Sequence, residues 1–123
     1  MVYSPLVCEH FTRPRNVGLL PNGPDVIAAS AGAVSEGVRF ALSARVTAER
    51  IREVHQQVYG CPHSIAAASW LSEQLVGLTL TQLEEWRWRG LAEALAVPVE
   101  KRGRLLVLED AVRALAKVWR ELP

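Results

Sequence analysis

The amino-acid sequence predicts an α+β fold in which helices pack on one face of a small antiparallel sheet. Two segments, residues 40–46 and 51–59, alternate apolar and polar side chains as half-buried strands do. The stretch 105–119 repeats apolar residues at helical spacing. A chain of 123 residues with 50% apolar and 22% charged content is expected to form one domain over residues 1–123.

The first element expected is a short N-terminal helix. Ser4 has the side chain of an N-cap, Pro5 suits the first helical position, and Pro14 ends the helix. One side of this helix is predicted to carry four residues at helical spacing: Leu6, Val7, His10 and Phe11. The turn-rich stretch 18–25 is then expected to be a surface loop.

The two strands are expected to form a hairpin. Four apolar side chains point to one face of the first strand: Phe40, Leu42, Ala44 and Val46. The second strand alternates Val54 and Val58 with polar residues. Residues 47–50 are expected to connect the strands, although they lack the asparagine–glycine pair of the tightest turns.

The second half of the chain is predicted to be mostly helical. Residues 64–76 form a helix that Gly77 ends. Thr81 and Glu84 have the spacing of a capping box, which predicts a short helix that stops near Gly90.

Two further helices are predicted after Gly90. The first covers residues 91–97 and is ended by Pro98, and the second is the long helix over residues 105–119. The solvent side of the long helix carries three cations: Arg113, Lys117 and Arg120.

Composition excludes several classes of protein. A formal net charge of +1 gives no field that would attract nucleic acid or an anionic membrane surface. The two cysteines, Cys8 and Cys61, are too few for a disulfide framework. The sequence has no apolar signal-peptide core and no run of ~18 apolar residues, so a reducing cytoplasm is the expected location.

Cys61 is the residue with the clearest chemical potential. It lies between a predicted strand and a predicted helix, where unpaired backbone N–H groups and the helix dipole favour a thiolate. His63 follows at a distance suited to a neighbouring cation or a ligand, although Cys61 taken alone also fits a small buried apolar residue. No set of nucleophile, base and orienting group is visible around it, so an enzyme is not expected. Cys8 is expected in the core, and Cys61 should therefore be the more reactive thiol.

Three stretches carry a resemblance to a known family. They are "YSPLVCEHFTRPRNVG" (residues 3–18), "YGCPHSIAAASWLSEQLVG" (residues 59–77) and "LEDAVRAL" (residues 108–115). Their order and spacing resemble those of the IscU-type iron–sulfur cluster assembly scaffolds, the family that includes the N-terminal domain of NifU. The resemblance implies an IscU/NifU-like sheet of about three strands, with helices on one face. The third strand is then expected near residues 24–33 or at residues 97–104.

The chain departs from this family at the ligand positions. The family holds its cluster with three cysteines and an aspartate, and of the cysteines only Cys61 is present here. Either Ser35 or Glu36 stands at the first cysteine, and Val38 stands at the aspartate. Near the last helix, the family's histidine and third cysteine correspond to Gly103 and Arg104.

The resemblance implies an iron–sulfur cluster, or a metal ion such as iron or zinc, as the bound group, but the substitutions equally allow none. Clusters and zinc take about four protein ligands. One chain offers Cys61, His63 and Glu36, beside a permanent cation at Arg104. A guanidinium opposes a metal ion but stabilises a thiolate or a persulfide.

Two functions are therefore open from the sequence. In the first, the protein is a scaffold-type assembly protein in which Cys61 accepts sulfur or is the lone cluster ligand. In the second, it is a non-catalytic paralogue that binds and regulates a cysteine desulfurase or another assembly partner without holding a cluster. Both imply a cysteine desulfurase and other iron–sulfur assembly proteins as partners, and neither implies nucleic acid or a membrane.

Overall fold

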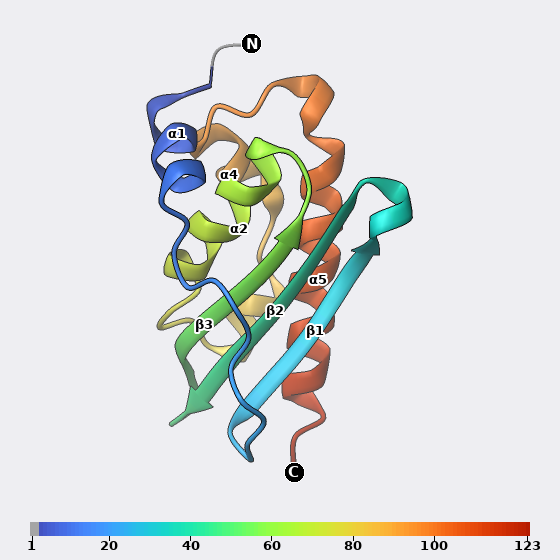
Figure 1. Cartoon of the computed structure of the whole chain (residues 1–123). Coiled ribbons are helices and arrows are strands. Elements are labelled where there is room, and N and C mark those ends of the chain that lie inside the picture. Colours follow the sequence, from blue (N-terminus) through green and yellow to red (C-terminus); the bar gives the residue numbers. More distant parts are fainter. Residues whose placement is uncertain (1–2) are drawn as a thin grey trace.

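The computed structural model describes residues 3–123 and confirms the α+β fold. Three antiparallel strands lie in the order β1-β2-β3: β1 (Val26–Ala33), β2 (Val38–Thr47) and β3 (Arg50–Tyr59). The helices α2 (Pro62–Gln74) and α5 (Gly103–Arg120) lie behind this sheet (Figure 1). The shorter elements are α1 (Pro5–Thr12), the 3₁₀ turn η1 (Val34–Glu36), α3 (Leu80–Glu84), α4 (Trp88–Ala94) and the 3₁₀ turn η2 (Val99–Lys101).

The β2–β3 hairpin forms where the sequence predicts it. Thr47 pairs with Arg50, so Ala48 and Glu49 are the two turn residues, and both have left-handed φ angles of 51° and 65°. Positive φ at both central residues is the geometry of a type I′ turn, whose twist matches that of the strands. Side chains other than glycine are strained there by roughly 1–2 kcal/mol each, so the strand pairing determines this turn against local preference.

The N-terminal segment after α1 covers part of the outer face of the sheet. Asn16 and Gly18 exchange backbone hydrogen bonds with Gln56 of β3, each 2.9 Å long, and the Leu20 N–H donates to the Ser43 hydroxyl at 2.9 Å. Ser43 is consequently buried on this outer face, at 0% exposure. Gln56 points to the core face like its strand partner Leu42; it is 1% exposed, and its amide donates to the Arg15 carbonyl at 2.9 Å. The expectation of a strand that is only half-buried is therefore wrong for the middle of β2.

The third strand is β1, which corresponds to the first of the two expected positions. Residues 97–104 do not form a strand, because their backbone groups are satisfied locally. The Lys101 N–H donates to the Pro98 carbonyl at 2.9 Å, and the Arg102 N–H donates to the Val99 carbonyl at 3.2 Å. These bonds form η2, and α5 begins directly afterwards at Gly103.

The capping box lies two residues earlier than predicted. Thr79 and Gln82 form it, with bonds of 2.9 and 3.3 Å. Glu84 instead accepts two hydrogen bonds of 2.7 Å from Arg120 at the end of α5. The predicted stop near Gly90 is wrong, since α3 ends at Glu84 and α4 runs through Gly90. The short helix expected over residues 91–97 is present as α4, but it begins at Trp88 and ends at Ala94.

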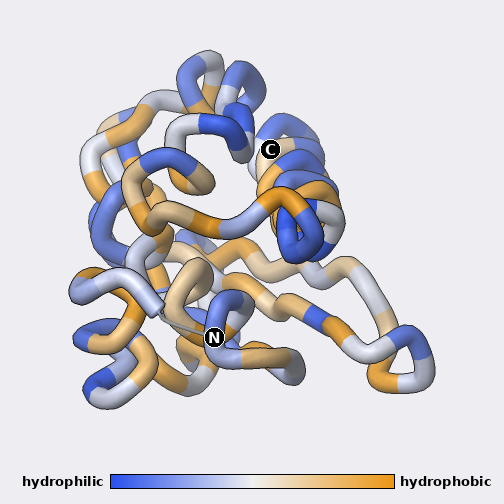
Figure 2. Tube along the Cα trace, turned by 90° about the horizontal axis from the view of Figure 1, so that it is seen from above, coloured by the Kyte–Doolittle hydropathy of each residue, from blue (hydrophilic) through white to orange (hydrophobic). Residues whose placement is uncertain are grey.

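One hydrophobic core lies between the sheet and the helices. Phe40 and Leu42 of β2 meet Leu71 of α2 and Leu108 of α5, and all four are at most 1% exposed. Figure 2 shows α5 almost end-on, with hydrophilic and hydrophobic residues on different sides, and the η1 connection projecting beyond the body of the molecule. Cys8 is exposed, contrary to prediction, because α1 buries only Val7 and His10.

Candidate functional site

Cys61 lies at the junction between β3 and α2, as predicted. It is the N-cap residue of α2, with extended backbone angles, and Pro62 occupies the first helical position. Gly60 is required before it, because a Cβ at Gly60 would lie 2.8 Å from the Cβ of Ser64 and 3.4 Å from a methyl group of Val38. The thiol is therefore held close to the first turn of α2 and next to the start of β2.

The surroundings of Cys61 favour its thiolate. Burial alone would raise the pKa of this thiol, but the Ser64 hydroxyl and the backbone N–H groups of Ser64 and His63 lower it, and so does the charge of Arg104. The net shift in the pKa is downward. The Sγ atom lies 3.5 Å from the Ser64 Oγ atom. Sequence reasoning missed Ser64, although the spacing between N-cap and third helical residue could have indicated it.

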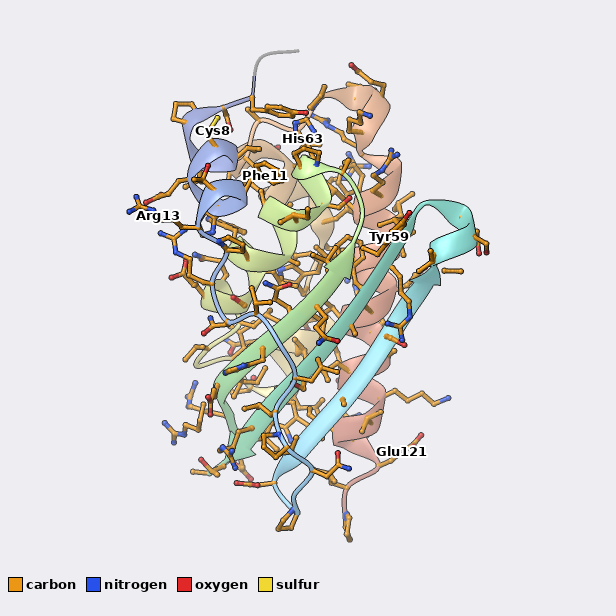
Figure 3. The ribbon with its side chains drawn as sticks, in the orientation of Figure 1. Cys8, Phe11, Arg13, Tyr59, His63 and Glu121 are labelled. Carbon is orange, nitrogen blue, oxygen red and sulfur yellow. The ribbon has the colours of Figure 1, made fainter. Side chains whose placement is uncertain are left out.

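His63 is buried rather than exposed to the site. It is 3% exposed, and its ring meets that of Tyr3 edge-on with centroids 4.9 Å apart. Burial lowers the pKa of His63, and the charge of Lys101 lowers it further. The side chain is thus neutral near pH 7 and does not supply the cation that the sequence allowed. Figure 3 shows His63 near the start of α2, in the same region as Tyr59 at the end of β3.

Four of the predicted site-equivalent positions line one pocket of about 260 Å³: Glu36, Val38, Gly103 and Arg104, together with Val107. Ser35 is in η1 but is not among these lining residues. The Nε atom of Arg104 is buried and has no hydrogen-bond partner within residues 3–123. The pocket lies where η1 meets the first turn of α5.

Next to this pocket, the close packing of β1 against β2 and α5 depends on Gly32. This residue has a φ of 87°, and a Cβ there would lie 2.3 Å from the Val38 carbonyl oxygen and 2.9 Å from a methyl group of Val107. Any larger residue would push β1 away from β2 and α5, so glycine allows these elements to pack closely beside the pocket.

The residues present do not fit a metal ion or a cluster within one chain. Among residues 3–123, no group of three or more histidine, cysteine and acidic side chains is close enough to hold a metal. Of the three expected ligands, His63 packs on Tyr3 and Glu36 is exposed, which leaves one thiol beside a guanidinium. Clusters and zinc need about four ligands, so this donor set is incomplete.

The fold and the site together define a scaffold-like α+β domain with one thiol at a strand-to-helix junction. The sequence profile of the family described as the NifU-like N-terminal domain matches residues 2–121. The chain belongs to this family.

Named relatives match nearly the whole chain. The iron–sulfur cluster assembly scaffold protein IscU of Azotobacter vinelandii is 34% identical over 122 residues, which cover 98% of this chain and 95% of that protein. Iron sulfur cluster assembly protein 1, mitochondrial, of Schizosaccharomyces pombe is 32% identical over 121 residues. The match covers 97% of this chain but only 63% of the yeast protein.

Solved structures show the same fold. An N-terminal NifU-like protein from Brucella abortus has a TM-score of 0.62 at 18% identity, covering 97% of this chain and 92% of that one. A structure described as a scaffold protein for the SUF system, from Fervidobacterium islandicum, has a TM-score of 0.64 at 16% identity, with coverages of 89% and 96%. Within residues 3–123, no helix has both the length and the apolar character needed to cross a membrane.

Proposed function

We propose that this protein is an iron–sulfur cluster assembly protein of the scaffold type, in which Cys61 accepts sulfur or acts as the lone cluster ligand. The observation that carries the proposal is the Cys61 thiol at the N-terminus of α2, with its lowered pKa. Relatives named as assembly scaffolds support the process. They favour this function over that of a regulatory paralogue without a cluster.

In this proposal Cys61 accepts a sulfur atom and does not turn over a substrate, so we do not propose that the protein is an enzyme. The thiolate attacks the outer sulfur of a donor persulfide, the sulfur–sulfur bond of the donor breaks, and the donor thiolate leaves. The first turn of α2 assists because its N–H groups stabilise the attacking thiolate.

The donor we propose is a cysteine desulfurase, and other iron–sulfur assembly proteins are the proposed later partners. We propose the cytoplasm as the compartment, where a reducing environment keeps the free thiols of Cys8 and Cys61 reduced. The yeast relatives carry mitochondrial names, and a mitochondrion would keep these thiols reduced as well.

Sulfur transfer from a desulfurase tests the proposed function. The protein is incubated with a cysteine desulfurase and cysteine carrying radioactive sulfur, and the label on each cysteine is measured after non-reducing proteolysis. We expect label on Cys61, none in Cys61→Ser, and unchanged labelling of Cys61 in Cys8→Ser. Label confined to Cys8 would contradict the role of Cys61.

Reconstitution tests how much of a cluster one chain can hold. After anaerobic incubation with iron and sulfide, we expect no stoichiometric cluster, because each chain offers one thiolate. Absorbance and metal analysis measure the result. A full [2Fe–2S] cluster, with about two irons per chain, would contradict this expectation. One cluster per two chains would instead support the lone-ligand form, with Cys61 of two copies sharing the cluster.

A further inference from the structure

Arg104 is an unusual residue for the pocket that it lines. Its Nε atom is buried and unpartnered in the part of the chain that the structure describes. A buried donor on a charged group costs about 1–3 kcal/mol or more when it lacks an acceptor. The neighbouring Arg102 has no such deficit, since its Nε donates to the Val97 carbonyl at 3.0 Å. An acceptor is therefore expected at Arg104 and not at Arg102.

The charges around the pocket favour an anion as that acceptor. The first turns of α2 and α5 contain no acidic residue. Glu36 is the one acid that lines the pocket, and it is exposed and forms no ion pair with Arg104 among the described residues. The pocket volume of about 260 Å³ is large enough for a small group.

The pocket and the Cys61 junction share Val38 as a neighbour, although Cys61 itself does not line the pocket. Val38 lines the pocket, and a methyl group of the same side chain lies 3.4 Å from the Cβ position of Gly60, the residue before Cys61. Val38 thus lies between the pocket and the residue that precedes Cys61. The charge of Arg104 also acts on the Cys61 thiol.

We propose that the Arg104 pocket is an anion site that holds the negatively charged terminal sulfur of a persulfide on Cys61. Arg104 thus makes this site selective for anionic sulfur at a position where the family has a metal ligand. The inference rests on the proposed role of Cys61 as a sulfur acceptor, and it excludes a metal as the resident occupant of the pocket.

The transfer step balances without an external oxidant. The Cys61 thiolate attacks the outer sulfur of a donor persulfide, R–S–SH, whose sulfur–sulfur bond breaks to release the thiolate R–S⁻. The new group on Cys61 passes its proton to R–S⁻, which leaves as the thiol R–SH. The remaining Cys61–S–S⁻ group accepts hydrogen bonds from the guanidinium of Arg104. One sulfur atom moves: Cys61 is oxidised from a thiol to a persulfide while the donor is reduced from a persulfide to a thiol, so the two changes cancel.

Charge-changing substitutions at Arg104 test the site. All variants are made in a Cys8→Ser background, and glutathione persulfide is the sulfur donor. Intact mass measures how much Cys61 gains one sulfur atom and how quickly that sulfur is lost to added thiol. Arg104→Gln is expected to shorten the lifetime of the persulfide roughly tenfold, the effect of losing one charge-assisted hydrogen bond. Arg104→Lys should retain most of the lifetime, and Arg102→Ala is the matched control that should retain all of it.

The outcomes separate this inference from the proposed function. If the parent protein gains no sulfur at Cys61 from either glutathione persulfide or a desulfurase, the acceptor role itself is wrong. If the parent gains sulfur and Arg104→Gln holds it as long as Arg104→Lys does, the anion site is wrong while the acceptor role stands. Circular dichroism checks that the compared variants are folded. Because glutamine and lysine are both long side chains, the comparison of Arg104→Gln with Arg104→Lys tests the loss of the charge.

Discussion

Cys61 and Cys8 differ both in solvent exposure and in the groups that surround each thiol. Cys8 is exposed on α1, with its Sγ atom 3.9 Å from the Tyr3 carbonyl oxygen. Cys61 is half-buried but lies at a helix N-terminus next to Ser64 and under the charge of Arg104. Because the thiolate is the reactive form, we expect the predicted higher reactivity of Cys61 to come from its ionisation and not from its exposure.

The pH dependence of alkylation tests this ionisation. In a Cys8→Ser protein, we expect the rate of iodoacetamide labelling at Cys61 to be half-maximal at a lower pH than for free cysteine measured under the same conditions. The sign follows from the lowered pKa, since a thiolate of low pKa persists as the pH falls. Mass spectrometry at a series of pH values measures the rate.

Arg104→Ala provides the comparison for this measurement. Since the charge of Arg104 contributes to the lowered pKa of Cys61, removing that charge should move the half-maximal rate to higher pH. A midpoint for the parent at or above that of free cysteine would show that burial outweighs the stabilising groups.

At the scale of elements, buried hydroxyl groups of α2 bind α1 and the segment after it, and Ser69 makes two of these hydrogen bonds. Ser69 is 0% exposed, and its Oγ atom lies 2.7 Å from His10 Nδ1 and accepts from the Arg15 N–H at 2.8 Å. Burial lowers the pKa of His10, so the neutral ring can accept the Ser69 proton. Ser72 donates to the Ser69 carbonyl at 2.6 Å and extends the network.

Ser69→Ala should therefore destabilise the fold more than an ordinary serine replacement. It leaves His10 Nδ1 and the Arg15 N–H without their partner, and we expect the free energy of unfolding to fall by about 2 kcal/mol. Urea denaturation measures this change. Ser30→Ala, at an exposed position of β1, is the matched control and should change stability by less than about 0.5 kcal/mol. Equal effects of the two substitutions would show that the network adds no stability.

The elements that were predictable are those whose pattern is local. The period-two runs at Phe40 and Ile51 and the helical stripe from Leu105 appear as β2, β3 and α5. The position of the capping box was not predictable, because two overlapping stretches, Thr79 to Gln82 and Thr81 to Glu84, both have the required spacing. Glu84 is not available for a capping box because it binds Arg120, which lies 36 residues away in the sequence. The burial of Cys8 was mispredicted for a different reason: the sequence of a short helix does not show which of its sides faces the core.

At the scale of the whole molecule, the site depends on segments that are distant in the chain. Glu36 and Val38 come from the β1–β2 connection, and Gly103 and Arg104 from the start of α5. Periodicity does not indicate that these segments meet, and only the family resemblance predicted it. The pocket brings together the four positions, while the role of each residue remains a prediction.

Restoring ligands tests whether this convergence has the geometry of a metal site. The substitutions are Glu36→Cys, Val38→Asp and Arg104→Cys in a Cys8→Ser background, which with Cys61 gives three thiolates and one carboxylate. That set suits four-coordinate zinc, and the loss of Arg104 removes a cation that opposes the ion. We expect tight zinc binding by competition with a chromogenic chelator, with an affinity that falls at lower pH as the thiols become protonated.

Two further proteins make this result decisive. One carries Ser35→Cys in place of Glu36→Cys, and it should bind zinc more weakly because Ser35 does not line the pocket. The other carries Arg102→Cys in place of Arg104→Cys, and it should also bind weakly because Arg102 is engaged with Val97. If neither the Glu36 nor the Ser35 version binds zinc while both remain folded by circular dichroism, the three segments do not converge as ligands require. The scaffold function would then lose its structural basis, and binding of an assembly partner without a cluster would be the better account.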